Sequence, residues 1–400
     1  MTMEKTFNRD HILIQIFYYV TVSSMLGFGT YTMLSRGYSA SGIGVLIAVA
    51  DLLGIAMNFF VSAYLDRSDK INVFQMAMLL ACAGLFAYII NCFCVEPSFV
   101  LSAAYVLSFS FHVSLSPLLD SVNTAFIKNG YEIHFGIGRS FGSFSYGIAC
   151  LLFGLISKHM DYYVILLLQI CFQSLLILVL FITNRDFRSV STIRENHENI
   201  EKINCSSFLK DHPAFIFTCL GYAGLMSCFS LLMESFLLPI ITSVGGTVFD
   251  SGLIQGIKAF LEVPFIFCFH LIEKNLSLKT IFLISGMSFI AKNIIMYSMN
   301  SVLPLYLSQI LQCSSFALIL PAFVSYINRN MKSNESARAY ALQAIIMTTI
   351  NMIMNSLGGY IVDLYGVKSL CLIAVIISVI STAVLMLSLE NSKTDGSYQE

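Results

Sequence analysis

Six charged side chains lie within long apolar stretches of the sequence, where a charge has few polar neighbours. Such groups cost roughly 2.5–3.5 kcal/mol each to insert into a bilayer, and they usually face a protein interior or a water-filled cavity. They are therefore the first candidates for chemistry in this chain, and His112 and His270 add two titratable rings, which we expect to be interior or interfacial. The six residues are Asp51, Asp120, Glu234, Lys258, Glu262 and Lys292.

Lys258 and Glu262 stand four positions apart, so they share one face of a helix and can neutralise each other. A carboxyl group in a partly dry site can load and release a proton near neutral pH. We therefore expect Glu262 to carry a proton, Lys258 to compete for its carboxylate, and Asp51 and Lys292 to take part in coupling. The alternative is that these groups only lower the insertion cost or join helices. Glu234 is expected to reach the outer interface.

The composition explains why these charges stand out. The chain has 400 residues, of which 57% are hydrophobic and 11% are charged, with a net charge of −1. Soluble domains carry about 25% charged residues, so this chain is not a cytosolic enzyme or a secreted scaffold. A neutral chain has no basic face for nucleic acid. The 11 cysteines are scattered, mostly in apolar runs, and are expected to be packing residues, with no metal site and no cofactor.

The apolar stretches are long enough to cross a membrane as helices, since a span needs about 20 residues. We predict an all-α membrane protein with twelve transmembrane helices. Their ranges are 11–34, 41–65, 71–94, 98–127, 139–157, 162–182, 213–237, 251–272, 279–298, 302–327, 338–362 and 369–389.

Loop charges and the longest polar stretch set the expected organisation. Most of the 22 Lys and Arg residues fall in loops on one side if both termini are cytoplasmic, which predicts a multi-pass protein of the plasma or inner membrane. Residues 1–182 are expected to form one six-helix bundle and residues 213–400 a second, with a short cytoplasmic tail. Residues 183–212 are expected to be a cytoplasmic linker.

The two halves share weak internal similarity. Ser-Gly pairs open the second helix of each half, at 41–42 and 251–252, and glycines recur in the fifth helices at Gly154 and Gly358. Such echoes are typical of duplicated transporter repeats. The sequence has no phosphate-binding G-x-x-x-x-G-K loop, so work against a gradient would have to draw on an ion gradient.

The loop after the second helix, AYLDRSDK, places Asp66, Arg67 and Lys70 at a cytoplasmic helix end. These residues are expected to form a gate that holds one conformation, or alternatively a solvated turn. With the two six-helix halves, the loop resembles that of the major facilitator superfamily, whose motif is G-x-x-x-D-R/K-x-G-R/K-R/K. Ser62 and Asp69 stand at its glycine positions.

A second stretch, AFIKNGYEIHFGIGRSFGSFSYG, resembles the lactose-permease-like, oligosaccharide–proton symporter branch of that superfamily. The matching residues are Phe135, Gly136, Arg139, Gly142 and Tyr146. The resemblance implies that Arg139 and an acid on the fourth helix, Asp120 here, bind the solute and that Tyr146 stacks on its ring. Gln343 aligns with Arg139 in the second half. The tenth helix lacks the acid and His of the branch's proton relay, so lactose and that relay do not transfer.

The sequence therefore predicts a secondary active transporter that takes up a small hydrophilic solute with protons, by alternating access of two bundles. A sugar or glycoside is the first candidate, and a nucleoside or small aromatic acid is the alternative. An efflux antiporter for amphipathic compounds is a second alternative, and sodium is an alternative coupling ion. We expect a monomer in the lipid bilayer. An intramembrane enzyme or a receptor is disfavoured, because no catalytic set and no sizeable soluble module are evident.

Overall fold

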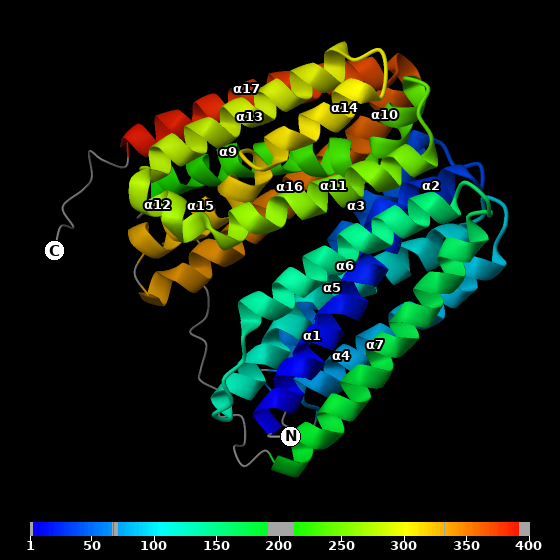
Figure 1. Cartoon of the computed structure of the whole chain (residues 1–400), viewed down its shortest axis with the longest axis vertical. Helices are drawn as coiled ribbons and strands as arrows, with labels where there is room; N and C mark the ends of the chain where they lie inside the picture. Colours follow the sequence, from blue (N-terminus) through cyan, green and yellow to red (C-terminus); the bar gives the residue numbers. More distant parts are fainter. Residues whose placement is uncertain (1–2, 66, 68–70, 191–211, 332, 392–400) are drawn as a thin grey trace. The chain divides into compact units, whose positions relative to one another are not determined.

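A computed structural model describes residues 3–65, 67, 71–190, 212–331 and 333–391. These residues are helical apart from short connections (Figure 1). The chain divides into two compact units, residues 1–199 and residues 200–400.

The described residues of unit 1 form six helical segments, the first of which is interrupted by a π-helical turn. That first segment consists of α1, η1 and α2. The elements are α1 (Met3–Val22), η1 (Ser23–Gly27), α2 (Gly29–Leu34), α3 (Ala40–Leu65), α4 (Val73–Phe93), α5 (Phe99–Lys128), α6 (Phe135–Ile156) and α7 (Tyr163–Val190).

Unit 2 also contains six helical segments among its described residues, and three of them are interrupted. The elements are α9 (Pro213–Ser230), η2 (Leu231–Ser235), α10 (Leu237–Ser243), α11 (Val248–Phe267), α12 (Phe269–Asn275), α13 (Leu278–Ser298), α14 (Leu303–Ser308), η3 (Gln309–Gln312), α15 (Phe316–Asn330), α16 (Ser333–Tyr365) and α17 (Val367–Asn391).

Ten helices of the described residues are long and apolar enough to cross a membrane, and the bent pair α11–α12 makes eleven. The α1–η1–α2 segment occupies the place of the first predicted span. The all-helical prediction is confirmed, with differences at the ends. The helix α7 continues to Val190, so residues 183–190 of the predicted linker are helical. The eighth span bends by 55° beyond Phe267, one turn after Pro264 removes a backbone donor.

Local sequence explains where several helices begin. At α4, the Asn72 side chain accepts from the Gln75 backbone, and the Gln75 side chain accepts from the Asn72 backbone. At α11, the Asp250 carboxylate accepts from both the backbone and the hydroxyl of Thr247. These capping contacts satisfy backbone donors that have no partner inside the helix.

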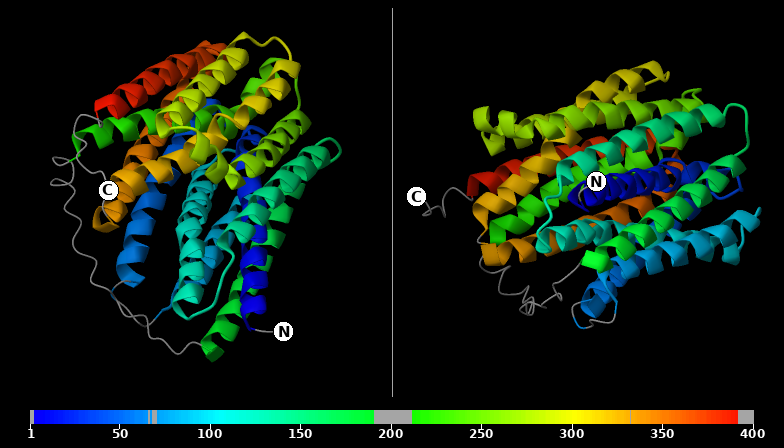
Figure 2. Two further views of the ribbon diagram at one scale, coloured as in Figure 1. Left: turned by 60° about the vertical axis from the view of Figure 1, so that its left-hand side comes forward. Right: turned by 60° about the horizontal axis from the view of Figure 1, so that its bottom comes forward.

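The two units repeat one packing pattern (Figures 1 and 2). In unit 1, α1 packs on α6 and α7, α4 packs on α5 and α7, and α3 packs on α5. In unit 2, α9 packs on α16 and α17, α13 packs on α15 and α17, and α11 packs on α15. The first segment of each unit thus contacts the fifth and sixth, the third contacts the fourth and sixth, and the second contacts the fourth.

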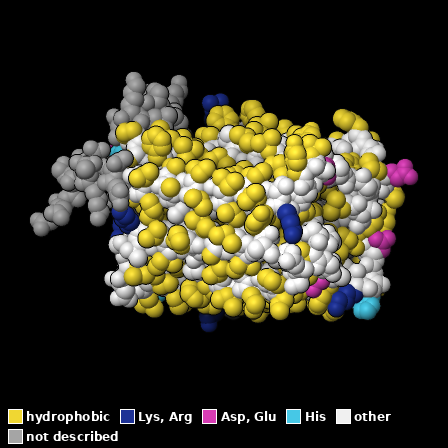
Figure 3. All heavy atoms as spheres, turned by 90° about the horizontal axis from the view of Figure 1, so that it is seen from above, with side chains coloured by type: hydrophobic (Ala, Val, Ile, Leu, Met, Phe, Trp, Pro, Cys, Tyr) yellow, Lys and Arg dark blue, Asp and Glu magenta, His cyan; other side chains and the backbone are white. Residues whose placement is uncertain are grey.

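Apolar side chains cover much of the surface, with few charges among them (Figure 3). Phe59, Phe60, Phe93 and Phe99 each expose more than two thirds of their area. A water-soluble monomer rarely shows such continuous apolar surface. The exposed faces therefore match a bilayer, whereas Lys258 of α11 and Lys292 of α13 are buried.

Candidate functional site

The most concentrated set of buried charges in the described part of unit 2 comes from three segments. The helix α11 carries Lys258 and Glu262, α13 carries Lys292, and the short 3₁₀ turn η3 supplies Gln309 and Gln312. Lys258 is 4% exposed and Lys292 is 2% exposed, while both glutamines are fully buried. We call these five residues the unit 2 charge cluster.

Lys292 is held by neutral groups. Its Nζ donates to Oε1 of Gln309 at 3.2 Å and to Oε1 of Gln312. Gln309 is itself fixed, because its Nε2 donates to the carbonyl of Leu305 at 2.9 Å. No carboxylate of the described residues forms an ion pair with Lys292. A buried ammonium satisfied only by amides is costly, which is typical of functional positions rather than of packing.

Glu262 is joined to this ammonium through an amide. Nε2 of Gln312 donates to Oε1 of Glu262 at 2.6 Å, while Oε1 of the same amide accepts from Lys292. The charges of Lys258, Lys292 and Glu234 all act on the Glu262 carboxylate. The proton-coupling candidates Glu262, Lys258 and Lys292 therefore lie together.

An aromatic ring lines the cluster. The Nζ atoms of Lys258 and Lys292 lie 4.8 and 5.8 Å from the ring centroid of Phe229, which stacks on Phe316 at 4.5 Å. Cation–π contacts of this kind stabilise a desolvated ammonium by about 2 kcal/mol. The ring therefore helps to keep two cations close together.

Glu234 lies close enough to the cluster for its charge to act on the Glu262 carboxylate, and its reach to the outer interface stays a prediction. It is half-buried within the π-helical turn η2, and its Oε2 accepts from Ser230 Oγ at 2.8 Å. A π turn inserts one extra residue into a helix and rotates the residues that follow. The residues that follow η2 are therefore turned relative to those of a regular helix.

The π turns occur at matching places in the two units. Met25 and Phe28 in unit 1 correspond to Met233 and Phe236 in unit 2, and both phenylalanines are buried with nearly the same backbone angles. Their φ and ψ values are −123° and 2° for Phe28, and −120° and 17° for Phe236. The spacing Met-x-x-Phe was the available sequence signal for this repeat.

Unit 1 places Arg139 on an aromatic platform. The Cζ atom of Arg139, from α6, lies 4.7 Å from the ring centroid of Tyr19 on α1. The charges of Arg139 and Asp120 both act on the hydroxyl of the adjacent Tyr18, so the three residues share one region. Asp120 and Arg139 form no ion pair in the described part of unit 1.

The remaining predicted residues lie elsewhere. Tyr146 is buried, with its hydroxyl 3.6 Å from the position that a Cβ would take at Gly27. Asp51, on α3, acts electrostatically on Tyr105 of α5. Gln343 belongs to unit 2, where its Nε2 contacts Sδ of Met347 at 3.7 Å. Gln343 is thus separate from the unit 2 charge cluster as defined above.

The expected cytoplasmic gate falls largely where the structure makes no statement. Asp66 and Lys70 lie outside the described residues, and Arg67 is exposed in a turn after α3. Its backbone N–H donates to the carbonyl of Tyr64 at 3.1 Å. The gate therefore stays a prediction.

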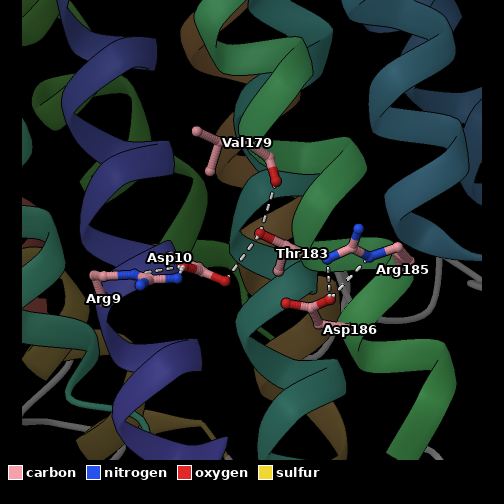
Figure 4. Close-up of polar contacts among 6 residues, drawn as sticks. All are labelled: Arg9, Asp10, Val179, Thr183, Arg185 and Asp186. Atoms are coloured by element: carbon pink, nitrogen blue, oxygen red, sulfur yellow. Dashed lines mark hydrogen bonds and ion pairs between the residues drawn. The ribbon is translucent and has the colours of Figure 1, made fainter. Parts of the chain in front are cut away.

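The sequence did not single out Asp10 or Arg36, which are both buried. Asp10, at 2% exposure, pairs with Arg9 at 2.8 Å and accepts from Thr183 of α7 at 3.4 Å (Figure 4). Arg36 donates to the carbonyl and the side chain of Asn91 at the end of α4. Both residues stand at the edges of apolar stretches, so the sequence did not indicate that they are buried.

His112 stacks on Tyr18 at 4.9 Å, as expected for an interior histidine. Within the described ranges, no group of three or more His, Cys, Asp or Glu side chains could hold a metal ion.

A model of the MFS_1-like family matches residues 13–373 of the chain. The chain belongs to this family. It is therefore a multi-pass membrane protein of the major facilitator superfamily, which confirms the resemblance at the level of the superfamily. No curated protein matches the chain by sequence.

Several solved transporters share the fold of this MFS_1-like protein. A variant of the nucleoside transporter NupG gives a TM-score of 0.80 at 14% identity, covering 95% of this chain and 99% of that chain. A bacterial homologue of the human lysosomal transporter Spinster gives 0.72 at 12%, covering 99% of each chain. A variant of the peptide transporter POT gives 0.73 at 11%, covering 96% and 94%. The family and these neighbours are transporters rather than enzymes, as the sequence predicted.

Proposed function

We propose that this MFS_1-like protein is a proton-coupled symporter of a small hydrophilic solute, with Glu262 as its proton-binding group. The observation that supports this role is the hydrogen-bonded chain from Glu262 through Gln312 to the buried Lys292. With Glu234 and Lys258 included, two acids face two lysines and the local charge is balanced. A proton on Glu262 would leave this region one charge more positive.

That change in charge provides a means of coupling. A buried region with an unbalanced charge is less stable, so protonation alters the relative free energies of the states that the carrier visits. A solute that interacts with the released lysine would restore the balance of interactions. Coupling then is the difference between the free energies of loaded and partly loaded states.

The proposed solute-binding surface in unit 1 combines Arg139, Asp120 and Tyr19. A guanidinium and a carboxylate can bind hydroxyl groups, and an aromatic face can stack on a ring. A sugar or glycoside fits this chemistry, as does a nucleoside. The fold-level similarity to NupG favours testing nucleosides beside sugars. Tyr146 and Gln343 are proposed as further contacts of the solute.

The remaining expectations belong to the same proposal. They are a place in the oligosaccharide–proton symporter branch, two bundles at 1–182 and 213–400, cytoplasmic termini in a plasma or inner membrane, and a monomer. Asp66, Arg67 and Lys70 are proposed to form the cytoplasmic gate, and Asp51 to assist coupling.

The test uses purified protein in liposomes. Thermal stabilisation by a panel of sugars, nucleosides and aromatic acids first selects the solute, since a bound ligand stabilises the folded state by mass action. We expect Glu262→Gln to abolish uptake driven by an inward proton gradient but to retain exchange of labelled for unlabelled solute. Glu96→Gln, the same substitution on an exposed loop, is the matched control.

Proton-driven uptake that survives in Glu262→Gln would remove Glu262 from the proton-binding role. Solute movement outward as protons enter would favour the antiporter instead.

A further inference from the structure

Gln312 occupies a position that only a carboxamide can satisfy. An ionised carboxylate accepts hydrogen bonds but cannot donate, and an ammonium donates but cannot accept. Gln312 meets both, because its Nε2 donates to Glu262 at 2.6 Å and its Oε1 accepts from Lys292. The side chain of Gln312 is fully buried and that of Glu262 is half-buried, so the amide itself is shielded from water. The charges of the two partners thus fix the orientation of the amide.

A proton on Glu262 turns this carboxylate from a hydrogen-bond acceptor into a group that must also donate a hydrogen bond. The new O–H donor needs a hydrogen-bond acceptor, and Glu262 is half-buried with the Gln312 amide already in contact. Within the described residues, Gln312 is the hydrogen-bond partner of Glu262, and the amide oxygen is its acceptor atom. Turning this oxygen toward Glu262 turns the amide NH₂ toward Lys292, where two donors would face each other.

We propose that Gln312 couples proton binding to solute binding: when Glu262 takes up a proton, the amide reverses and releases Lys292 to bind an oxygen atom of the solute. This inference rests on the proposed function and assigns Gln312 as a positioning residue, because it acts through its two neighbours. The solute must then carry a hydroxyl, carbonyl or carboxylate oxygen as a hydrogen-bond acceptor.

The contacts that Lys292 keeps after the amide reverses explain why the solute binds after the proton. After release, Lys292 keeps Gln309 at 3.2 Å and the face of Phe229. Loss of a hydrogen bond to a buried charge disfavours that state by about tenfold or more. A solute oxygen removes this penalty. Without the proton, Gln312 occupies the ammonium and the solute has to compete with it.

Other charged or titratable groups also lie near Glu262 and influence its protonation. Lys258 lies on the same helix, Lys292 on α13, Glu234 on η2, and the Cys313 thiol follows η3. None of them replaces the amide, because the hydrogen bond to Glu262 comes from Gln312.

Infrared difference spectroscopy of the full chain in lipid, recorded across a pH change without solute, tests this step. We expect a protonated-carboxyl band that disappears in Glu262→Gln, together with a glutamine side-chain amide band that shifts with isotope-labelled glutamine. Gln312→Met, of similar length but without the amide, should lose the glutamine band and keep the carboxyl band. Gln309→Met, which removes the other amide contact of Lys292, should keep both bands.

The outcomes separate the two proposals. A carboxyl band that depends on Glu262, with a glutamine band unchanged in Gln312→Met, would overturn the amide reversal and leave the proton site intact. Absence of any carboxyl band that depends on Glu262 would overturn both. Gln312→Asn, which keeps the amide but is too short to span both partners, repeats the test if Gln312→Met does not fold.

Discussion

Gly142→Ala should disturb the contact on which Arg139 rests. A Cβ at Gly142 of α6 would lie 2.5, 3.0 and 3.3 Å from the ring atoms Cδ2, Cε2 and Cγ of Tyr19. Apolar atoms pack at about 3.5–4.0 Å, so the ring would have to retreat by roughly 1 Å. Overpacking of this degree costs about 1–3 kcal/mol. The same displacement would remove the ring from beneath the guanidinium of Arg139, now 4.7 Å from its centroid.

Gly136→Ala is the matched control on the same helix, since no atom lies within 4 Å of a Cβ at Gly136. Both substitutions replace Gly by Ala in α6, which favours the helix by up to about 1 kcal/mol. The difference between the variants therefore reports mainly the clash. The chain has no tryptophan, so circular dichroism is the suitable probe of thermal unfolding. We expect a lower midpoint for Gly142→Ala than for Gly136→Ala, and equal midpoints would refute the packing argument.

Two further substitutions test single contacts. Tyr19→Phe keeps the ring beneath Arg139 and should leave the half-saturation concentration for solute uptake unchanged. Tyr19→Leu removes the ring and should raise that concentration by about two- to fivefold. Equal values for both variants would contradict the role of the ring. Thr183→Val should lower the free energy of unfolding by about 1 kcal/mol through loss of the hydrogen bond to Asp10 (Figure 4). Thr349→Val is the control, since the Thr349 hydroxyl donates to the carbonyl of Ile345 one turn earlier in the same helix. An equal loss of unfolding free energy in both variants would show that the Asp10 contact contributes nothing measurable.

The helices could be predicted because a bilayer demands long apolar stretches that satisfy their own backbone. Lys258 and Glu262 could be paired for a similar reason, since their spacing of four residues fixes a shared face. The Lys292 contacts could not be predicted, because they depend on how α13 packs beside η3. Gln312 could not be singled out from the sequence, since a neutral amide carries no sign of the charges it joins.

Irregular helices account for the other differences. The π turn at residues 231–235 rotates the helix around Glu234, which a regular helical period does not anticipate. The 3₁₀ turn at 309–312 is wound more tightly than an α-helix, and it also changes the directions of Gln309 and Gln312. Such irregularities arise from packing between segments, which local sequence does not specify.

The most direct test of proton coupling through Glu262 is proton movement driven by the solute alone. Liposomes containing the protein and a trapped pH indicator are given the selected solute outside, with no initial pH gradient and with the membrane potential clamped. The account predicts that the wild-type interior acidifies as solute enters and that Glu262→Gln shows no pH change. Solute entry without acidification in the wild type, or equal acidification in Glu262→Gln, would contradict it.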